Sequence, residues 1–153
     1  MKRSAINAAL RAARATVTQH GFALPAWADW TADHHAANPE QSAFLIGRQI
    51  GWDVTDFGSG DFARRGLTLL CIRNGIQGDD SERPYAEKLL ISRQDQLSPM
   101  HTHVIKAEDI INRGGATLVV ELFGSDDKGN CAPDRGGMVR CDGIDVPMRR
   151  GRS

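Results

Sequence analysis

The sequence lacks a surplus of charge of either sign, and it lacks any long apolar run. Nineteen Lys and Arg side chains balance nineteen Asp and Glu side chains, so the formal net charge is zero. Nucleic acids and anionic membranes usually attract proteins through a strong basic excess, so we expect neither as a partner. No apolar run approaches the roughly 20 residues that a membrane-spanning helix requires. With 153 residues, the chain is long enough for one domain with an apolar core.

Cysteine is scarce as well. Cys71, Cys131 and Cys141 are odd in number, and their spacings match no zinc-binding pattern. We predict reduced thiols, as in a cytoplasmic protein. The basic N-terminus does not predict secretion, because Asn7 and Arg11 interrupt the apolar stretch that a signal peptide needs. A basic, amphipathic transit peptide is the lesser alternative for this end.

The first 50 residues have the character of helices. Apolar residues recur at helical spacing over residues 4–19, with Ser4 as the expected N-cap and Gly21 as the expected stop. Residues 22–36 show no clear period and read as an ordered segment anchored by Trp27 and Trp30. A second short helix is predicted over 38–48. We therefore predict a helical N-terminal extension that spans residues 1–50.

The remainder reads as a series of strands and turns. Residues 51–62 are rich in Gly and Asp and predict tight turns, and the chain from Gly124 on reads mostly as loop. Strands in series with no long helix between them indicate an antiparallel sandwich or barrel. No repeat or low-complexity linker divides the chain, which predicts a single domain over 1–153. The expected strands cover residues 67–72, 85–92, 97–104 and 116–123, with a further short one near 138–141.

The segment from Pro99 to Gly115 carries the chemistry. His101 and His103 are two residues apart, which on a strand places both imidazoles on one face, and Glu108 follows five residues later. Two imidazoles and a carboxylate suit a divalent cation such as manganese, iron or zinc. The sequence Asn-Arg-Gly-Gly at 112–115 predicts a chain reversal beyond them. A surface pair of histidines is the alternative explanation of this spacing taken alone.

The spacing of His101, His103, Glu108 and Gly115 resembles the first motif of the cupin superfamily, except that Asp95 stands where the motif has a leading glycine. Over most of its length the chain resembles the D-lyxose isomerase family within that superfamily. The segments that carry this resemblance are MKRSAIN, HGFALPAWADW, GWDVTDFGSGDF, GLTLLCIRNG, PYAEKLLISR, PMHTHVIKAEDIINRGG and ATLVVELFGSDD.

The resemblance implies a mainly β fold, a cupin (RmlC-like jelly-roll) barrel, in a cytoplasmic homodimer. It implies a metal-dependent aldose–ketose isomerase that interconverts D-lyxose and D-xylulose, with D-mannose and D-fructose as the second pair. His101, His103 and Glu108 match metal ligands of the family, and Lys88 and Lys106 match positions that contact the sugar. The implied cofactor is a divalent cation, Mn²⁺ first, with Zn²⁺, Co²⁺ or Fe²⁺ as alternatives.

The chain also departs from the family. Cupin sites usually take a last histidine from a later PxGxxH-type motif, yet no histidine follows His103. The catalytic carboxylate and a supporting arginine are likewise expected downstream of Ser153, so the catalytic residues stay unassigned. We expect a barrel that is incomplete at its C-terminus, and a frameshift or premature stop as the origin of the unrelated residues 148–153.

Two other functions compete with an isomerase. A two-histidine, one-carboxylate iron oxygenase uses the same three ligands. A non-catalytic cupin fragment could bind metal or sugar weakly, or pair with another chain that completes its barrel. Oxygen consumption with ferrous iron distinguishes the first alternative, and metal binding without turnover distinguishes the second.

Overall fold

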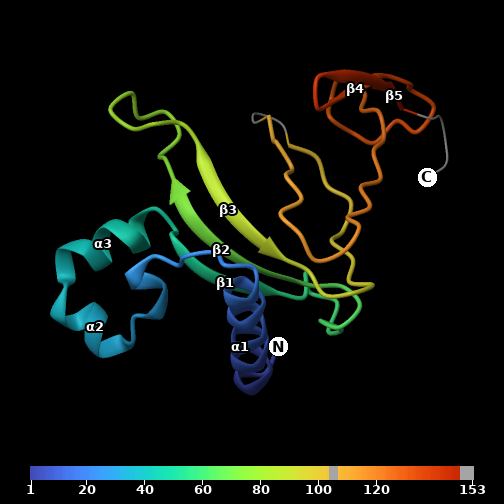
Figure 1. Cartoon of the computed structure of the whole chain (residues 1–153). Coiled ribbons are helices and arrows are strands. Elements are labelled where there is room, and N and C mark those ends of the chain that lie inside the picture. Colours follow the sequence, from blue (N-terminus) through green and yellow to red (C-terminus); the bar gives the residue numbers. More distant parts are fainter. Residues whose placement is uncertain (104–106, 149–153) are drawn as a thin grey trace. The chain divides into compact units, whose positions relative to one another are not determined.

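The computed structural model describes residues 1–103 and 107–148, and these residues form two compact units. The first unit comprises Met1–Pro99 and the second begins at Met100. The first unit holds the helices and a three-stranded sheet, and the second holds the segment with His101 and His103 and a small hairpin (Figure 1). It stays a prediction that residues 1–153 form a single domain with residues 1–50 as its helical extension. In the described part of the chain, no helix has both the length and the apolar character to cross a membrane.

Helix α1 (Arg3–Gln19) confirms the first predicted helix. Its buried residues Ala9, Ala13 and Val17 form one stripe, and the other faces are largely exposed. The small side chains on this stripe let the helix approach the sheet closely, and α1 contacts strands β1 and β2. The helix therefore covers one face of the sheet, as Figure 1 shows.

The two ends of α1 differ in how well the sequence predicts them. Ser4 is not the N-cap: the helix begins one residue earlier, and Lys2 occupies the cap position without a side-chain hydrogen bond. At the other end Gly21 has a φ of 67°, a left-handed conformation that suits glycine. The N–H groups of Gly21 and Phe22 bond to carbonyls in the last turn of the helix, which forms a Schellman motif. The predicted stop at Gly21 is thus confirmed.

Arg14 joins α1 to the rest of the unit. Its guanidinium pairs with Asp29, donates to the carbonyl of Ala28 and lies 5.6 Å from the centre of the Trp52 ring. The indole Nε1 of Trp52 donates to the same Ala28 carbonyl at 3.0 Å. Because Arg14 and Trp52 both donate to the Ala28 carbonyl, they hold α1 and the first strand against the 3₁₀ turn that contains Ala28.

The segment after α1 is more regular than its sequence predicts. It contains the 3₁₀ helix η1 (Ala26–Asp29) and α2 (Ala32–Ala37), which Thr31 caps by accepting from the backbone of His34. Helix α3 (Pro39–Gly47) follows and confirms the second predicted helix. Its proline at the first position removes an N–H that would have had no partner inside the helix.

The sheet of the first unit is antiparallel, with β2 between the other two strands. Trp52, Leu70 and Leu89 lie opposite one another across it, and Leu70 is completely buried. This row faces α1, because Trp52 meets Arg14 there. The strands are β1 (Gly51–Thr55), β2 (Leu67–Asn74) and β3 (Ala86–Ile91).

Strands β2 and β3 confirm the predictions for 67–72 and 85–92, whereas the turns predicted over 51–62 begin too early. Residues 51–55 are strand β1, because Trp52 and Val54 alternate onto the covered face and satisfy a strand's period of two. The turns start only at Asp56, whose carboxylate accepts from the N–H of Gly58 at 3.1 Å.

Two predicted strands are wrong in the described residues. Over 97–103, Leu97 makes only an isolated bridge with Arg65, and the described residues 116–123 contain no strand (position 104 lies outside the described part). Alternating apolar residues form a strand only when a neighbour accepts and donates the ladder hydrogen bonds. The antiparallel sheets and N-terminal helices confirm the mainly β fold and are consistent with a cupin-type architecture, although the described residues do not close a barrel.

The second unit ends in a hairpin of β4 (Met138–Cys141) and β5 (Ile144–Pro147). The short strand predicted near 138–141 is confirmed, whereas β5 replaces part of a predicted loop. The two-residue turn Asp142-Gly143 has φ angles of 48° and 83°, as a type I′ hairpin requires. Asp-Gly between two short apolar runs was the signal that could have predicted β5.

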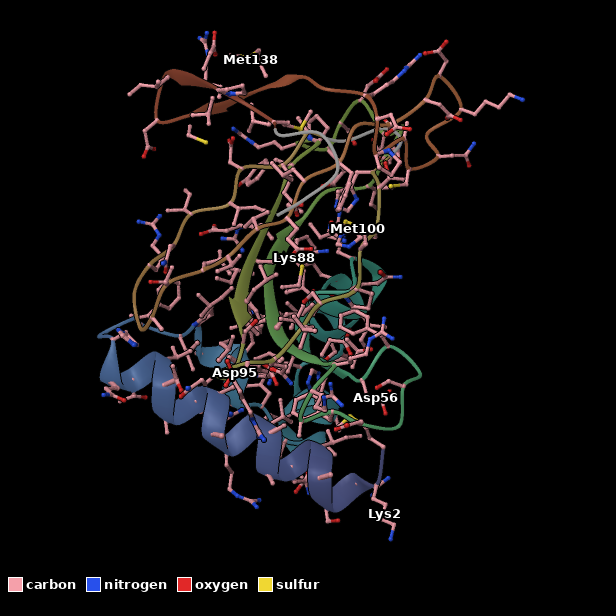
Figure 2. The ribbon with its side chains drawn as sticks, turned by 90° about the vertical axis from the view of Figure 1, so that its right-hand side faces the viewer. Lys2, Asp56, Lys88, Asp95, Met100 and Met138 are labelled. Carbon is pink, nitrogen blue, oxygen red and sulfur yellow. The ribbon has the colours of Figure 1, made fainter. Side chains whose placement is uncertain are left out.

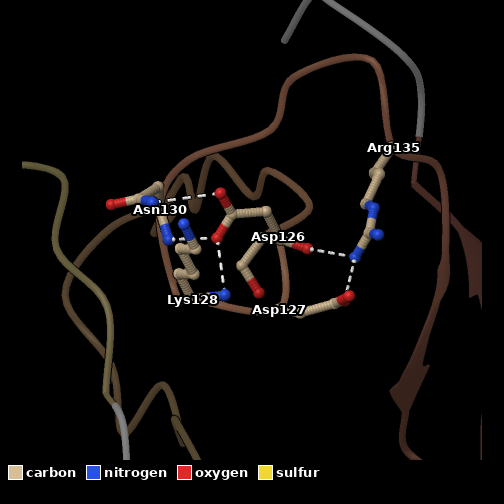
Figure 3. A network of polar contacts seen from close by, with 6 residues as sticks. Asp126, Asp127, Lys128, Asn130 and Arg135 are labelled. Carbon is tan, nitrogen blue, oxygen red and sulfur yellow. Dashed lines mark hydrogen bonds and ion pairs between the residues drawn. The ribbon is translucent and has the colours of Figure 1, made fainter.

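An acidic turn precedes this hairpin (Figure 3). Asp126 accepts from the backbone N–H groups of Lys128 and Asn130 at 2.8 and 2.9 Å and from the side-chain amide of Asn130 at 3.0 Å. These hydrogen bonds, the Asn130 side chain first, lower the pKa of the Asp126 carboxyl. Arg135 pairs with Asp127 at 2.9 Å and donates to Ser125. The carboxylates of this turn therefore stabilise the loop itself.

Candidate metal centre

His101, His103 and Glu108 come together in the second unit, as the sequence predicts. One ligand atom from each lies within 4.8 Å of those of the other two. The imidazoles of His101 and His103 meet edge to face, with ring centres 4.8 Å apart and an angle of 81° between their planes. His103 Nε2 lies 3.2 Å from Glu108 Oε2. In the described part of the chain, no other group of three His, Cys, Asp or Glu residues converges in this way.

The three side chains converge without the strand that the prediction assumed, because residues 100–103 are irregular. The chain reverses further on, where the Asn112 side chain accepts from Gly114 N–H at 3.1 Å and donates to the carbonyl of Ala116 at 3.0 Å. Gly114 and Gly115 have φ angles of 139° and 98°, which suit glycine alone. The predicted reversal at 112–115 is therefore confirmed.

Asp95 stands where the cupin motif has a glycine, and its φ is 58°. Asp is among the few non-glycine residues that tolerate this left-handed conformation. Around it the chain makes a tight turn, in which Gln96 N–H donates to the Arg93 carbonyl at 3.2 Å and the Gln96 side chain accepts from Arg93 N–H at 3.0 Å. The turn that the glycine would provide is thus formed with aspartate in its place.

The donor set fits a divalent cation. Metal–ligand distances near 2.1 Å place neighbouring ligand atoms roughly 3–3.5 Å apart, and the His103–Glu108 pair, at 3.2 Å, has that separation. All three ligand atoms lie within 4.8 Å of one another, so a pair at that limit would have to approach by about 1.3–1.8 Å, which side-chain rotation can supply. The side chains of His103 and Glu108 are 30% and 42% exposed, so solvent reaches the cluster.

Of the two lysines that are predicted to contact the sugar, the structure describes only Lys88. Lys88 lies exposed on β3, on the sheet face opposite to the one that α1 covers (Figure 2). Its register partner is Cys71, whose pKa is raised by burial and lowered to a lesser degree by the Lys88 charge. Lys88 belongs to the first unit and the ligand cluster to the second, so its role at the site stays a prediction. Lys106 lies outside the described residues.

Comparison with known proteins identifies the family of the chain. The sequence profile of the D-lyxose isomerase family matches residues 1–153. A D-lyxose/D-mannose isomerase of Escherichia coli O157:H7 is 44% identical over 128 residues, which are 82% of this chain and 56% of that protein. A D-lyxose/D-mannose isomerase of Serratia proteamaculans is 43% identical over 141 residues, 86% of this chain and 59% of that protein.

The match covers most of this chain but only part of each relative. The chain spans a little under three fifths of the length of each relative, whereas more than four fifths of the chain takes part in the match. Identity above two fifths over more than 120 residues, together with a profile match along the whole sequence, defines its ancestry. The chain belongs to the D-lyxose isomerase family.

Proposed function

We propose that His101, His103 and Glu108 bind a divalent metal ion, Mn²⁺ first, in a sugar isomerase of the D-lyxose/D-xylulose and D-mannose/D-fructose type. The convergence of three ligand atoms within 4.8 Å carries this proposal. The names of the two relatives support the choice of sugars. A cytoplasmic homodimer is part of the same proposal.

The chemistry is a proton transfer between the first two carbons of the open-chain sugar. A bound divalent cation supplies Lewis acidity at the two neighbouring sugar oxygens. Glu108 and the two imidazoles would hold the cation, and the Glu108 carboxylate would offset part of its charge. Lys88 and Lys106 are proposed to donate hydrogen bonds to sugar hydroxyls and to stabilise negative charge on the reacting oxygens. The residue that moves the proton is not among those assigned in this chain.

A non-catalytic metal- or sugar-binding role is the second candidate. Three protein ligands can hold a metal ion while water fills the remaining positions, and the cluster is open to solvent. The described residues form one three-stranded and one two-stranded sheet and do not close a barrel.

Metal titration and an isomerisation assay test the two candidates together. We expect Mn²⁺ to bind in calorimetry with a stoichiometry of one, and His103→Ala and Glu108→Gln each to weaken binding about tenfold or more. His20→Ala is the matched control, because His20 lies at the exposed C-cap of α1. Binding that is unaffected by His103→Ala contradicts the proposed ligands.

The isomerisation assay then separates enzyme from binding protein. Conversion of D-lyxose to D-xylulose that requires Mn²⁺ and is lost in Glu108→Gln supports the isomerase. Normal Mn²⁺ binding without conversion of D-lyxose or D-mannose supports the non-catalytic role for the chain of residues 1–153.

A further inference from the structure

Two short segments of the first unit bond to each other just before the chain reaches the candidate metal ligands. Residues 62–66 lead into β2 and residues 93–97 follow β3, and we call this pair of segments the clasp. Leu97 N–H donates to the Arg64 carbonyl at 2.8 Å, and Gly66 N–H donates to the Leu97 carbonyl at 3.1 Å. Both backbone groups of Leu97 are therefore paired.

The Gln96 side chain lies at the polar centre of the clasp. Its amide nitrogen donates to the Phe62 carbonyl, and its amide oxygen accepts from Arg93 N–H at 3.0 Å. The Arg93 guanidinium also lies 5.1 Å from the centre of the Phe62 ring, which adds a cation–π contact between the same two segments. Both ends of the Gln96 amide are thus bonded, and this one side chain joins the two segments.

Hydrogen bonds hold the clasp closed more than packing does, because the Leu97 side chain is 63% exposed. Gly66 permits the close approach of the two segments and is itself buried. A Cβ atom at Gly66 would lie 2.6 Å from the Phe62 carbonyl oxygen and 2.7 Å from Gln96 Nε2, which is too close for both to stay in place. Glycine is needed here for space, so a methyl group at this position opens the clasp.

Three residues separate the clasp from the first candidate ligand, His101, and the middle one is Pro99. Proline fixes its own φ and restricts the residue before it, so few conformations are open to the chain between Leu97 and His101. We propose that Gln96 is a positioning residue for metal binding: it holds Leu97 and thereby restricts residues 100–103 before a metal ion binds. Ordering of a free segment opposes binding, and a segment that is already restricted avoids part of that cost. This inference rests on the proposed function.

Backbone NMR relaxation and Mn²⁺ calorimetry on the whole chain test the proposal with Gln96→Ala. Without metal, the order parameters of residues 100–103 should fall from their wild-type values to about 0.6 or less, as in a flexible backbone. The Mn²⁺ dissociation constant should rise about tenfold at an unchanged stoichiometry. Gln94→Ala is the matched control, because Gln94 is an exposed glutamine of the same segment, and it should change neither quantity.

Further variants separate positioning from loss of the fold. Gly66→Ala opens the clasp while Gln96 is kept, and it should produce the same two changes. Gly47→Ala is its control, because a Cβ atom at Gly47 meets nothing within 4 Å. Gln96→Glu keeps the acceptor for Arg93 N–H and loses only the donor to the Phe62 carbonyl, so it should act in the same direction. Amide exchange in β2, which is paired on both sides, should stay slow in every variant and shows that the sheet is intact.

The proposal requires the two changes together, and either change alone in Gln96→Ala overturns it. Equal changes in Gln94→Ala overturn it as well, and so does loss of slow exchange in β2 in both Gln96 variants, since Gln96 would then act on the fold. A wild-type chain that binds no Mn²⁺ refutes the proposed function instead. The order parameters are measured without metal, so they still decide whether Gln96 restricts residues 100–103.

Discussion

Replacement of Leu70 by alanine should destabilise the first unit by about 3 kcal/mol. Leu70 is completely buried in the central strand, between Trp52 and Leu89. Removal of about three methylene equivalents costs about 2.4 kcal/mol in transfer free energy, and the remaining cavity adds to that cost. The sum lies within the range of about 2–5 kcal/mol that is typical of such changes.

Urea unfolding followed by tryptophan fluorescence measures this loss. All three tryptophans lie between residues 27 and 52, so the signal reports on the first unit alone. With a denaturant slope of about 2 kcal/mol per molar, the midpoint should fall by about 1.5 M. Leu90→Ala is the matched control, because Leu90 is 57% exposed on the opposite face and should cost less than about 1 kcal/mol. Equal midpoints for the two variants would refute the packing described for this sheet.

Four further outcomes follow from other features of the structure. Alkylation of Cys71 should show a pH midpoint above that of the two exposed cysteines, because burial raises the pKa of its thiol. Lys88→Met should move that midpoint further upward, since the Lys88 charge lowers this pKa, and an unchanged midpoint would place the ammonium elsewhere. Gly143→Ala should lower the melting temperature of the second unit in calorimetry by an amount equivalent to about 1 kcal/mol, because φ is 83° at that position. Trp52→Phe should cost about 1 kcal/mol in urea unfolding through loss of the indole bond to Ala28, and no loss would contradict that bond.

The elements that the sequence predicted well are those whose pattern is satisfied locally or by near neighbours. Helix α1 has a continuous apolar stripe and a glycine stop, and β2 and β3 pair with each other across one connection. Strand β1 was missed because its Gly and Asp content hid the alternation of Trp52 and Val54. In this segment the period of two is a better indicator of a strand than the composition is.

The two wrong strands have a different cause. Residues 116–123 alternate as a strand does, but an apolar pattern specifies only a face and says nothing of which chain segment pairs with it. The sequence therefore predicts which side chains of residues 116–123 share a face, but it does not determine which segment pairs with them. The same limit applies to Leu97, which makes only an isolated bridge.

The convergence of His101, His103 and Glu108 was predicted more accurately than the backbone that carries them. Spacing and residue type were sufficient to bring His101, His103 and Glu108 together, although the expected strand is absent from residues 100–103. The chemistry of the donors is a stronger signal than the regularity of the chain between them. Lys88 could not be related to the cluster in this way, because its relation depends on contacts far apart in the sequence.

The openness of the ligand cluster has a consequence for metal identity. With His103 30% exposed and Glu108 42% exposed, a cation held there would exchange with the surrounding solution instead of being trapped during folding. Sites of nitrogen and oxygen donors without a rigid enclosure follow the general order of divalent affinities, in which copper and zinc exceed manganese. Under such exchange the occupant depends on both this order and the supply of free metal ions, so the cation in a purified sample would reflect the solution with which it was last equilibrated.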